Sequence, residues 1–286
     1  MKKIKVEDLV LDIIIYTTLT LLTIVCAYPV WYVIVASFSN TTDLALNQGL
    51  LLWPREFDFG GYMLVFRDKS IVQGFINSVL VLVLSLPINI VLTLFCGYFL
   101  SCTNMFWKKI LVNIIMFTMM FHGGMIPAYL NVRDLGLYNT IWALVLPGAL
   151  SVYNAVICKT AIEGVPDSLK ESAYIDGASD WVIIFKIIMP LIKATLAVLL
   201  MYYGVAHWNA WFNASIYLKE ERLLPLQNII RNLLISNSVA DADDFNAYAE
   251  TIKYSAIVVS TVPIMCVYPF LQKHFTKGIM IGAVKG

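Results

Sequence analysis

The sequence predicts an all-α membrane protein with six transmembrane helices, and its composition and its long apolar stretches are the observations that predict this class. Of the 286 residues, 59% are hydrophobic and 14% are charged, whereas soluble domains are about half apolar and about a quarter charged. A spanning helix needs about 20 mostly apolar residues, and several stretches reach that length. The net charge of +1 gives no reason to expect a nucleic-acid partner.

The six predicted spans are separated by polar segments. They run over residues 11–38, 72–100, 110–129, 138–158, 182–205 and 252–271. The first apolar run is too long for a signal peptide and lacks a small-x-small cleavage site, so we expect it to be retained as a span. We divide the chain into an N-terminal span with its outer loop (1–70), a transmembrane core (71–272) and a C-terminal tail (273–286).

Basic residues set the predicted orientation, because lysine and arginine favour the cytoplasmic side. With the N-terminus inside, six spans place the C-terminus inside too. Lys108 and Lys109 then mark the loop between the second and third spans as cytoplasmic, whereas residues 236–250 contain acidic residues and no basic one. By the same alternation, the segment around Glu171 faces the cytoplasm.

The second span carries a stripe of small and polar residues on one face. They recur at spacings of four and seven: Gly74, Ser78, Ser85, Asn89, Thr93 and Gly97. Such a stripe lets helices approach closely and form hydrogen bonds in lipid. It could instead line a polar pathway, and the sequence leaves both interpretations open.

A polar, helix-prone segment lies between the fourth and fifth spans. Pro166 and Asp167 open a helix, because proline suits the first turn and an acidic group favours the positive N-terminal end. Gly177 supplies a break, at a C-cap or a sharp turn. Asp180 begins a second helical run that enters the membrane, and Pro190 is predicted to bend that span near its cytoplasmic side.

The short helix in this segment is suited to dock in a groove of a soluble partner. Glu171 offers a charge, and Ser172 and Ala173 allow close backbone approach. An ordinary cytoplasmic loop is the alternative, since loops of this length between spans are common. The regular spacing from Glu171 through Gly177 to Pro190 is more specific than such a loop requires.

This spacing resembles the motif of the permease subunits of binding-protein-dependent ABC importers: Glu-Ala-Ala, three residues, Gly, nine residues, Ile-x-Leu-Pro. The chain departs from the motif at two positions, with Ser172 for the second residue and Met189 for the leucine. Its last segment, 275–286, looks like the C-terminus of maltose-type sugar permeases. Segments 121–127 and 207–213 look like those of the branch that imports complex oligosaccharides.

The resemblance implies a type I ABC importer permease fold with a cytoplasmic coupling helix at about residues 165–180. It implies a multi-pass subunit of the bacterial plasma membrane, surrounded by lipid, with both termini cytoplasmic. The implied partners are a second homologous permease, two copies of a cytoplasmic ATPase and an extracytoplasmic substrate-binding protein. The residues implied in ATPase coupling are Glu171, Ser172, Ala173, Gly177 and Pro190.

The chain itself has no GxxxxGK[ST] phosphate loop, in agreement with ATP and magnesium being used by the partner ATPases. We expect no cofactor, no catalytic residue and no metal site in it. Asp241, Asp243 and Asp244 lack the glycine and the ligand spacing of a calcium hand, so we interpret them as part of a solvated outer loop that could face the binding protein. The five cysteines lie in or beside apolar segments and are expected to pack as small apolar residues.

Segment 207–213 is the best local candidate for a sugar path. Trp208 and Trp211 are expected on adjoining faces of a helical turn, with Asn209 and Asn213 four residues apart. Flat aromatic rings match the apolar faces of sugars, and amides match their hydroxyl edges. The alternative is an aromatic belt, because tryptophan is enriched at membrane interfaces. His122 is a further path candidate, with a structural role as its alternative.

Two rival functions are disfavoured and one stays open. An ion-coupled secondary transporter needs buried ionisable residues in mid-span, and the six spans have almost none. A membrane enzyme needs paired catalytic groups, and the three histidines form no such motif. A permease of the same superfamily for a non-sugar solute, such as a peptide, remains an alternative.

Overall fold

The computed structural model describes residues 6–46, 49–102, 107–121, 123–235, 250–266 and 269. This part of the chain is built of helices, and its only β-pairing is an isolated bridge between Ser39 and Phe57. The prediction of an all-α membrane protein is confirmed. His122, the three aspartates 241, 243 and 244, and the tail from 273 onward lie outside the described residues.

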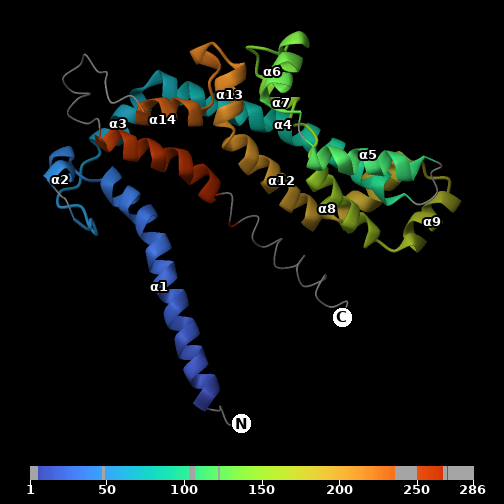
Figure 1. Cartoon of the computed structure of the whole chain (residues 1–286), viewed down its shortest axis with the longest axis horizontal. Coiled ribbons are helices and arrows are strands. Elements are labelled where there is room, and N and C mark those ends of the chain that lie inside the picture. Colours follow the sequence, from blue (N-terminus) through green and yellow to red (C-terminus); the bar gives the residue numbers. More distant parts are fainter. Residues whose placement is uncertain are drawn as a thin grey trace. The chain divides into compact units, whose positions relative to one another are not determined.

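The chain forms two compact units (Figure 1). The first comprises Met1–Lys69 and Asn232–Val262, and the second comprises Ser70–Arg231 and Pro263–Gly286. Helices of the first unit are α1 (Val6–Ser37), α2 (Thr41–Leu46), α3 (Gly60–Arg67) and the helix over residues 250–266. The last of these belongs to the predicted sixth span, and the part of it up to Val262 lies in the first unit.

The first unit is held together by close polar and aromatic contacts. The hydroxyls of Ser37 and Tyr62 are 2.7 Å apart, and those of Thr41 and Thr251 are 2.8 Å apart. A Cβ on Gly61 would lie 2.7 Å from Ser255 Oγ, so only glycine lets α3 approach helix 250–266 this closely.

The second unit contains the remaining helices. They are α4 (Lys69–Ser101), α5 (Lys108–Met120), α6 (Met125–Asp134), α7 (Trp142–Val145), α8 (Val152–Glu163), α9 (Asp167–Ile175), α10 (Asp180–Val182), η1 (Ile183–Ile188), α11 (Met189–Leu191), α12 (Lys193–Trp208), α13 (Trp211–Tyr217), η2 (Glu221–Leu223) and α14 (Leu226–Ile235). All residues predicted to act in coupling lie here, as do the described candidates for the sugar path.

Two helices are long and apolar enough to cross a membrane alone, Leu9–Ser37 and Lys69–Ser101. They match the first two predicted spans. The third and fifth spans are pairs of helices bent by more than 40°, and the fourth is split between α7 and α8. Of these three breaks, only the bend of the fifth span was predicted from the sequence.

Local residues account for the breaks. In the third span, Gly124 precedes α6 with φ of 93°, a backbone conformation that glycine adopts without steric cost. In the fifth span, Asp180–Leu191 and Lys193–Trp208 meet at 87°. Pro190 has no N–H to donate, and the preceding turn is the π-helix η1, so the predicted bend at Pro190 is confirmed.

Candidate functional site

Helix α9 is the polar helix predicted between the fourth and fifth spans. It begins after Pro166, and its last turn is closed by two backbone hydrogen bonds, from Ala178 N to Ala173 O (2.9 Å) and from Gly177 N to Tyr174 O (3.0 Å). This pair of bonds is a Schellman motif, which requires a left-handed residue after the helix. Gly177 supplies it with φ of 77°, so the predicted helix break is present.

One face of α9 is anchored to the membrane helices. Ala173 is buried in a cluster of apolar side chains from α4, α8, η1 and α12. The buried members are Ile90, Leu94, Cys158, Ile162, Val165, Ala173, Ile183, Ile188, Ile192, Leu196 and Leu199. A displacement of α9 would therefore disturb three spans at once, because packed interiors transmit strain.

The opposite face of α9 is exposed and mixed in character. Glu171 and Ser172 lie at the surface, and the apolar Ile175 is 86% exposed, whereas Leu169, one turn before Ala173 and on its side of the helix, is 43% exposed. Ser172 Oγ donates to Leu169 O at 3.2 Å, so it turns back to its own helix. The predicted coupling residues thus divide: Ala173 faces the core, Glu171 and Ser172 face outward, and Gly177 shapes the turn. Pro190, in α11, is exposed and lies at the bend.

Three side chains fasten the end of α4 to both sides of this turn, and we call them the tyrosine latch: Tyr98, Tyr174 and Asp180. The two phenol oxygens are 2.8 Å apart. Tyr98 donates to Asp180 Oδ1 at 2.9 Å, and Tyr174 donates to the same oxygen at 2.5 Å. The hydrogen bonds from Tyr174 and then Tyr98 hold the pKa of the Asp180 carboxyl below its usual value, so it is charged at neutral pH.

The sequence could not reveal this latch, because Tyr98 is 76 residues from Tyr174 and 82 residues from Asp180 along the chain. In the sequence, Tyr98 lies in an apolar segment and Tyr174 lies in a polar helix, and neither position indicates a partner. Only the packing of α9 against α4 brings the hydroxyls together. The one local signal is an acidic residue, Asp180, at the start of a helix, where a carboxylate is favoured anyway.

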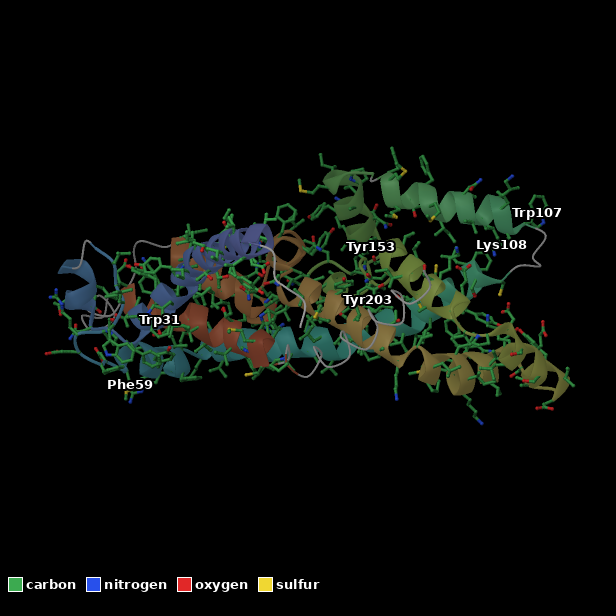
Figure 2. All side chains as sticks on the ribbon, turned by 90° about the horizontal axis from the view of Figure 1, so that it is seen from below. Trp31, Phe59, Trp107, Lys108, Tyr153 and Tyr203 are labelled. Carbon is green, nitrogen blue, oxygen red and sulfur yellow. The ribbon has the colours of Figure 1, made fainter. Side chains whose placement is uncertain are left out.

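The polar stripe of α4 is buried along its whole length. Ser78 Oγ accepts from Leu226 N (2.9 Å), and Thr93 Oγ1 lies 2.7 Å from the hydroxyl of Tyr203. That hydroxyl also accepts from Ser151 N at 3.0 Å (Tyr203 is labelled in Figure 2). The described structure therefore favours the packing interpretation over an open pathway.

Asn89 lies at the centre of this stripe and binds two other segments of the chain. Its Nδ2 donates to the carbonyls of Gly148 and Ala149 at 3.2 and 2.8 Å. Its Oδ1 is therefore the acceptor for His207 Nε2, 3.0 Å away, which fixes the proton on that ring nitrogen. The broken stretch between α7 and α8 thus finds its hydrogen bonds in side chains of α4, as backbone at membrane depth must.

The candidate sugar-path residues do not form one helical turn. Helix α12 ends at Trp208 and α13 begins at Trp211, so the expected adjoining faces were wrong. Trp208 is 4% exposed and meets Phe75 edge to face. Trp211 is half-buried beneath Arg231, whose guanidinium carbon is 3.9 Å from the ring centroid. Asn209 and Asn213 are exposed.

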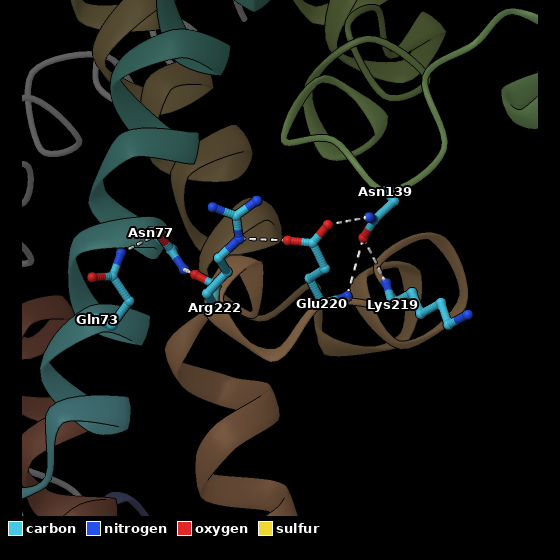
Figure 3. A network of polar contacts seen from close by, with 6 residues as sticks. All are labelled: Gln73, Asn77, Asn139, Lys219, Glu220 and Arg222. Atoms are coloured by element: carbon cyan, nitrogen blue, oxygen red, sulfur yellow. Dashed lines mark hydrogen bonds and ion pairs between the residues drawn. The ribbon is translucent and has the colours of Figure 1, made fainter.

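A polar network joins the loop after α13 to α4 and to the turn before α7 (Figure 3). Asn139, with φ of 57°, accepts from Lys219 N and Glu220 N at 3.0 and 3.1 Å and donates to Glu220 Oε1 at 2.9 Å. Arg222 also binds this carboxylate, and Asn77 donates to Arg222 O at 2.8 Å. Hydrogen bonds from Arg222 and Asn139 lower the pKa of the Glu220 carboxyl.

Helix α4 separates the two candidate regions. Tyr98, near its C-terminal end, binds α9, whereas Ser78, near its N-terminal end, binds α14. Twenty residues of α-helix span about 30 Å, the thickness of the hydrocarbon core of a bilayer. Figure 1 shows α9 toward one end of this unit and α13 toward the other. The two regions are therefore spaced to lie on opposite sides of a membrane.

Comparison with known proteins gives a family match. The family described as "Binding-protein-dependent transport system inner membrane component" matches residues 59–281. The chain is 36% identical over 281 residues to the polygalacturonan/rhamnogalacturonan transport system permease protein YtcP of Bacillus subtilis (strain 168), covering 96% of this chain and 98% of the relative. It is 25% identical to the arabinooligosaccharides transport system permease protein AraQ of Halalkalibacterium halodurans, covering 92% of each chain.

The fold also matches a solved structure. A chain from the crystal structure of a bacterial ABC transporter involved in the import of the acidic polysaccharide alginate superposes with a TM-score of 0.91 at 28% identity, covering 96% of this chain and all of that one. The type I ABC importer permease fold is thereby confirmed. The chain belongs to the family of inner membrane components of binding-protein-dependent transport systems.

Proposed function

We propose that this chain is one of the two membrane-spanning subunits of an ATP-driven importer of oligosaccharides, and that α9 is the element on which cytoplasmic ATPase subunits act. The exposed face of α9, backed by the buried Ala173, is the observation that carries the coupling assignment. Carbohydrate names recur among the relatives, which supports an oligosaccharide as cargo. A peptide or another solute has no such support.

The proposed assembly follows the family. A second homologous permease, two copies of the ATPase and an extracytoplasmic binding protein complete it, with both termini of this chain in the cytoplasm. ATP and magnesium bind in the ATPase subunits. The exposed Ile175 supplies apolar contact area for a groove of the ATPase, and Glu171, one turn before it on the same face, supplies a charge. Such a helix-in-groove contact uses apolar anchors on one helix face.

The mechanism proposed for coupling needs an element with two positions that both ATP and the loaded binding protein favour differently. Closure of the ATPases would move α9. The buried cluster around Ala173 would pass that motion to α4, α8 and α12. Lys108, at the start of α5, lies toward the same end of the unit as α9, in keeping with a shared cytoplasmic side (Figure 2).

The coupling assignment is tested in the reconstituted importer. Glu171→Ala and Gly177→Pro are expected to lower ATP hydrolysis stimulated by loaded binding protein. The first removes the exposed charge, and the second disrupts the turn that ends α9 and sets its orientation. Glu163→Gln is the matched control, since Glu163 is an exposed carboxylate on α8 that pairs with Lys159. Wild-type transport and normal recovery of the ATPase with both α9 variants would refute the assignment.

A further inference from the structure

We infer that Arg231 of α14, held over the indole of Trp211 on α13, is a binding point for the carboxylate of an acidic sugar on the route of the transported substrate. This inference rests on the proposed function and deepens it, because it names the chemistry of the cargo. The ligand class is an oligosaccharide that contains uronate units.

The geometry of the pair leaves the guanidinium ready to bind an anion. Its carbon lies 3.9 Å from the centroid of the Trp211 ring, in contact with the ring face. Arginine stacked on an aromatic ring uses the face of its planar group, while its N–H donors point outward in that plane. Those donors match the two oxygens of a carboxylate in a bidentate contact.

The two helices that carry the pair are fixed to each other. Asn228, one turn before Arg231, is buried and donates to Trp211 O and to Ser215 Oγ, each at 2.9 Å. The first residue of α14, Leu226, is bound through its N–H to Ser78 of α4. The guanidinium therefore extends from a braced pair of helices, and its stacking on Trp211 limits its freedom before any ligand arrives, which lowers the entropic cost of binding.

Arg231 differs from the two other arginines of its unit in its lack of an acidic partner among the described residues. Arg133 pairs with Asp134 at 3.1 Å, and Arg222 pairs with Glu220. In the described part of the chain Arg231 forms no ion pair, and its side chain is exposed. A carboxylate ligand would complete at Arg231 the type of pair that the chain itself completes at Arg133 and Arg222.

The proposed contact rests on the guanidinium and not on the neighbouring amides. Asn209 Nδ2 donates to Val205 O at 2.9 Å, and Asn213 lies on the opposite side of α13 from Trp211. Trp211 then acts by positioning Arg231 and not as a stacking platform for the sugar ring, since the arginine already covers one face of the indole.

The test uses the complete importer reconstituted in proteoliposomes, with ATP-driven uptake of labelled trigalacturonate and of its carboxyl-reduced, neutral counterpart. Arg231→Gln is expected to lower trigalacturonate uptake roughly 10- to 100-fold, the effect of losing a charge-assisted hydrogen bond. Uptake of the neutral trisaccharide should be unchanged. Arg231→Lys keeps the charge without the planar fork and should fall between the two.

Arg133→Gln is the matched control, because it removes an exposed arginine that is already paired within the chain. It is expected to leave both uptake rates at the wild-type level. Recovery of the assembled complex and its basal ATP hydrolysis should be equal in all variants, which separates a ligand contact from a folding defect.

Three outcomes would overturn the inference: equal uptake of trigalacturonate by Arg231→Gln and wild type, an equal loss for the acidic and neutral trisaccharides, or a wild-type importer that carries only the neutral one. The last of these leaves the proposed function intact, since an oligosaccharide is still imported. Failure of the proposed function shows differently, as no uptake of either trisaccharide by the wild-type assembly.

Discussion

Trp208 and Trp211 stand three residues apart, yet their indole rings lie in different environments. Trp208 ends α12, is 4% exposed and packs against Phe75. Trp211 begins α13 and is half-buried under Arg231. The sequence does not distinguish a tryptophan that fills space from one that positions a charge. Only the neighbouring side chains in the structure show which role each tryptophan has.

The difference predicts distinct mutant behaviour. Trp208→Ala would leave a cavity and is expected to destabilise the protein by about 3 to 5 kcal/mol, lowering the amount of inserted protein and hence uptake of every substrate by the same factor. Trp211→Ala should leave the inserted amount near wild type and lower uptake of acidic sugars selectively. Uptake of two oligosaccharides, normalised to inserted protein, checks this. A substrate-selective loss in Trp208→Ala would contradict it.

At the scale of single elements, α9 is defined by how its ends are held. Its C-terminal turn is closed by the Schellman hydrogen bonds before Gly177, and the tyrosine latch ties the turn to the end of α4. The latch joins both sides of the turn, since Tyr174 precedes Gly177 and Asp180 follows it. We therefore expect α9 and the end of α4 to move together.

Tyr98→Phe tests the latch, because it removes the hydroxyl and keeps the ring that packs on the buried cluster. We expect the number of ATP molecules hydrolysed per sugar imported to rise, since α9 would move with less effect on α4. Each lost hydrogen bond is worth about 1 kcal/mol, so the complex should still assemble. Tyr153→Phe is the control, as that side chain is 56% exposed on α8. An unchanged ratio in Tyr98→Phe would remove the latch from the coupling mechanism.

At the scale of the whole molecule, the second unit has two functional ends joined by α4. The α9 end is proposed to be cytoplasmic, and the end that carries α13 and α14 is proposed to face outward. The separation of about 30 Å along α4 fits a bilayer core of the same thickness. This arrangement makes the orientation testable at two exposed positions.

A cysteine placed at Ser179 should react with an impermeant thiol reagent only from the cytoplasmic side, and one placed at Glu221 only from outside. Both residues are exposed, and the Ser179 side chain makes no capping hydrogen bond, so substitution should be tolerated. The five native cysteines must first be replaced. Labelling of intact cells and of inverted vesicles gives the two readings. The reverse pattern would overturn the proposed orientation.

Much of the coupling region could be predicted from sequence because its signals are local. Pro166 and Asp167 start α9, Gly177 ends it in a left-handed conformation, and Pro190 marks the bend. Each follows from the backbone chemistry of one residue, which acts the same way in any context. The division of α9 into a buried Ala173 and an exposed Glu171 followed from the packing partners and could not be read from the motif.

The apolar, helical character of the spans was predicted, but their continuity was not. Against six predicted spans, the described residues contain two helices able to cross a membrane alone, or up to four spans if each bent pair is counted as one. Hydropathy reports whether a segment can lie in lipid and does not report whether its helix is straight. The non-helical stretch between α7 and α8 contains Pro147 and Gly148, and Asn89 of α4 satisfies the carbonyls of Gly148 and Ala149 from another part of the chain. The sugar-path residues failed as a single helical turn because α12 ends at Trp208 and α13 begins only at Trp211.

The sequence alone determined that this is an all-helical membrane protein with a polar helix between two spans, because apolar length, proline and glycine act through local chemistry. The tertiary structure decided which polar side chains pair, through the tyrosine latch and the Asn89 contacts, and that Arg231 stacks on Trp211. Those pairings join residues far apart in the sequence. Their geometry depends on how the helices pack, and no local pattern encodes it.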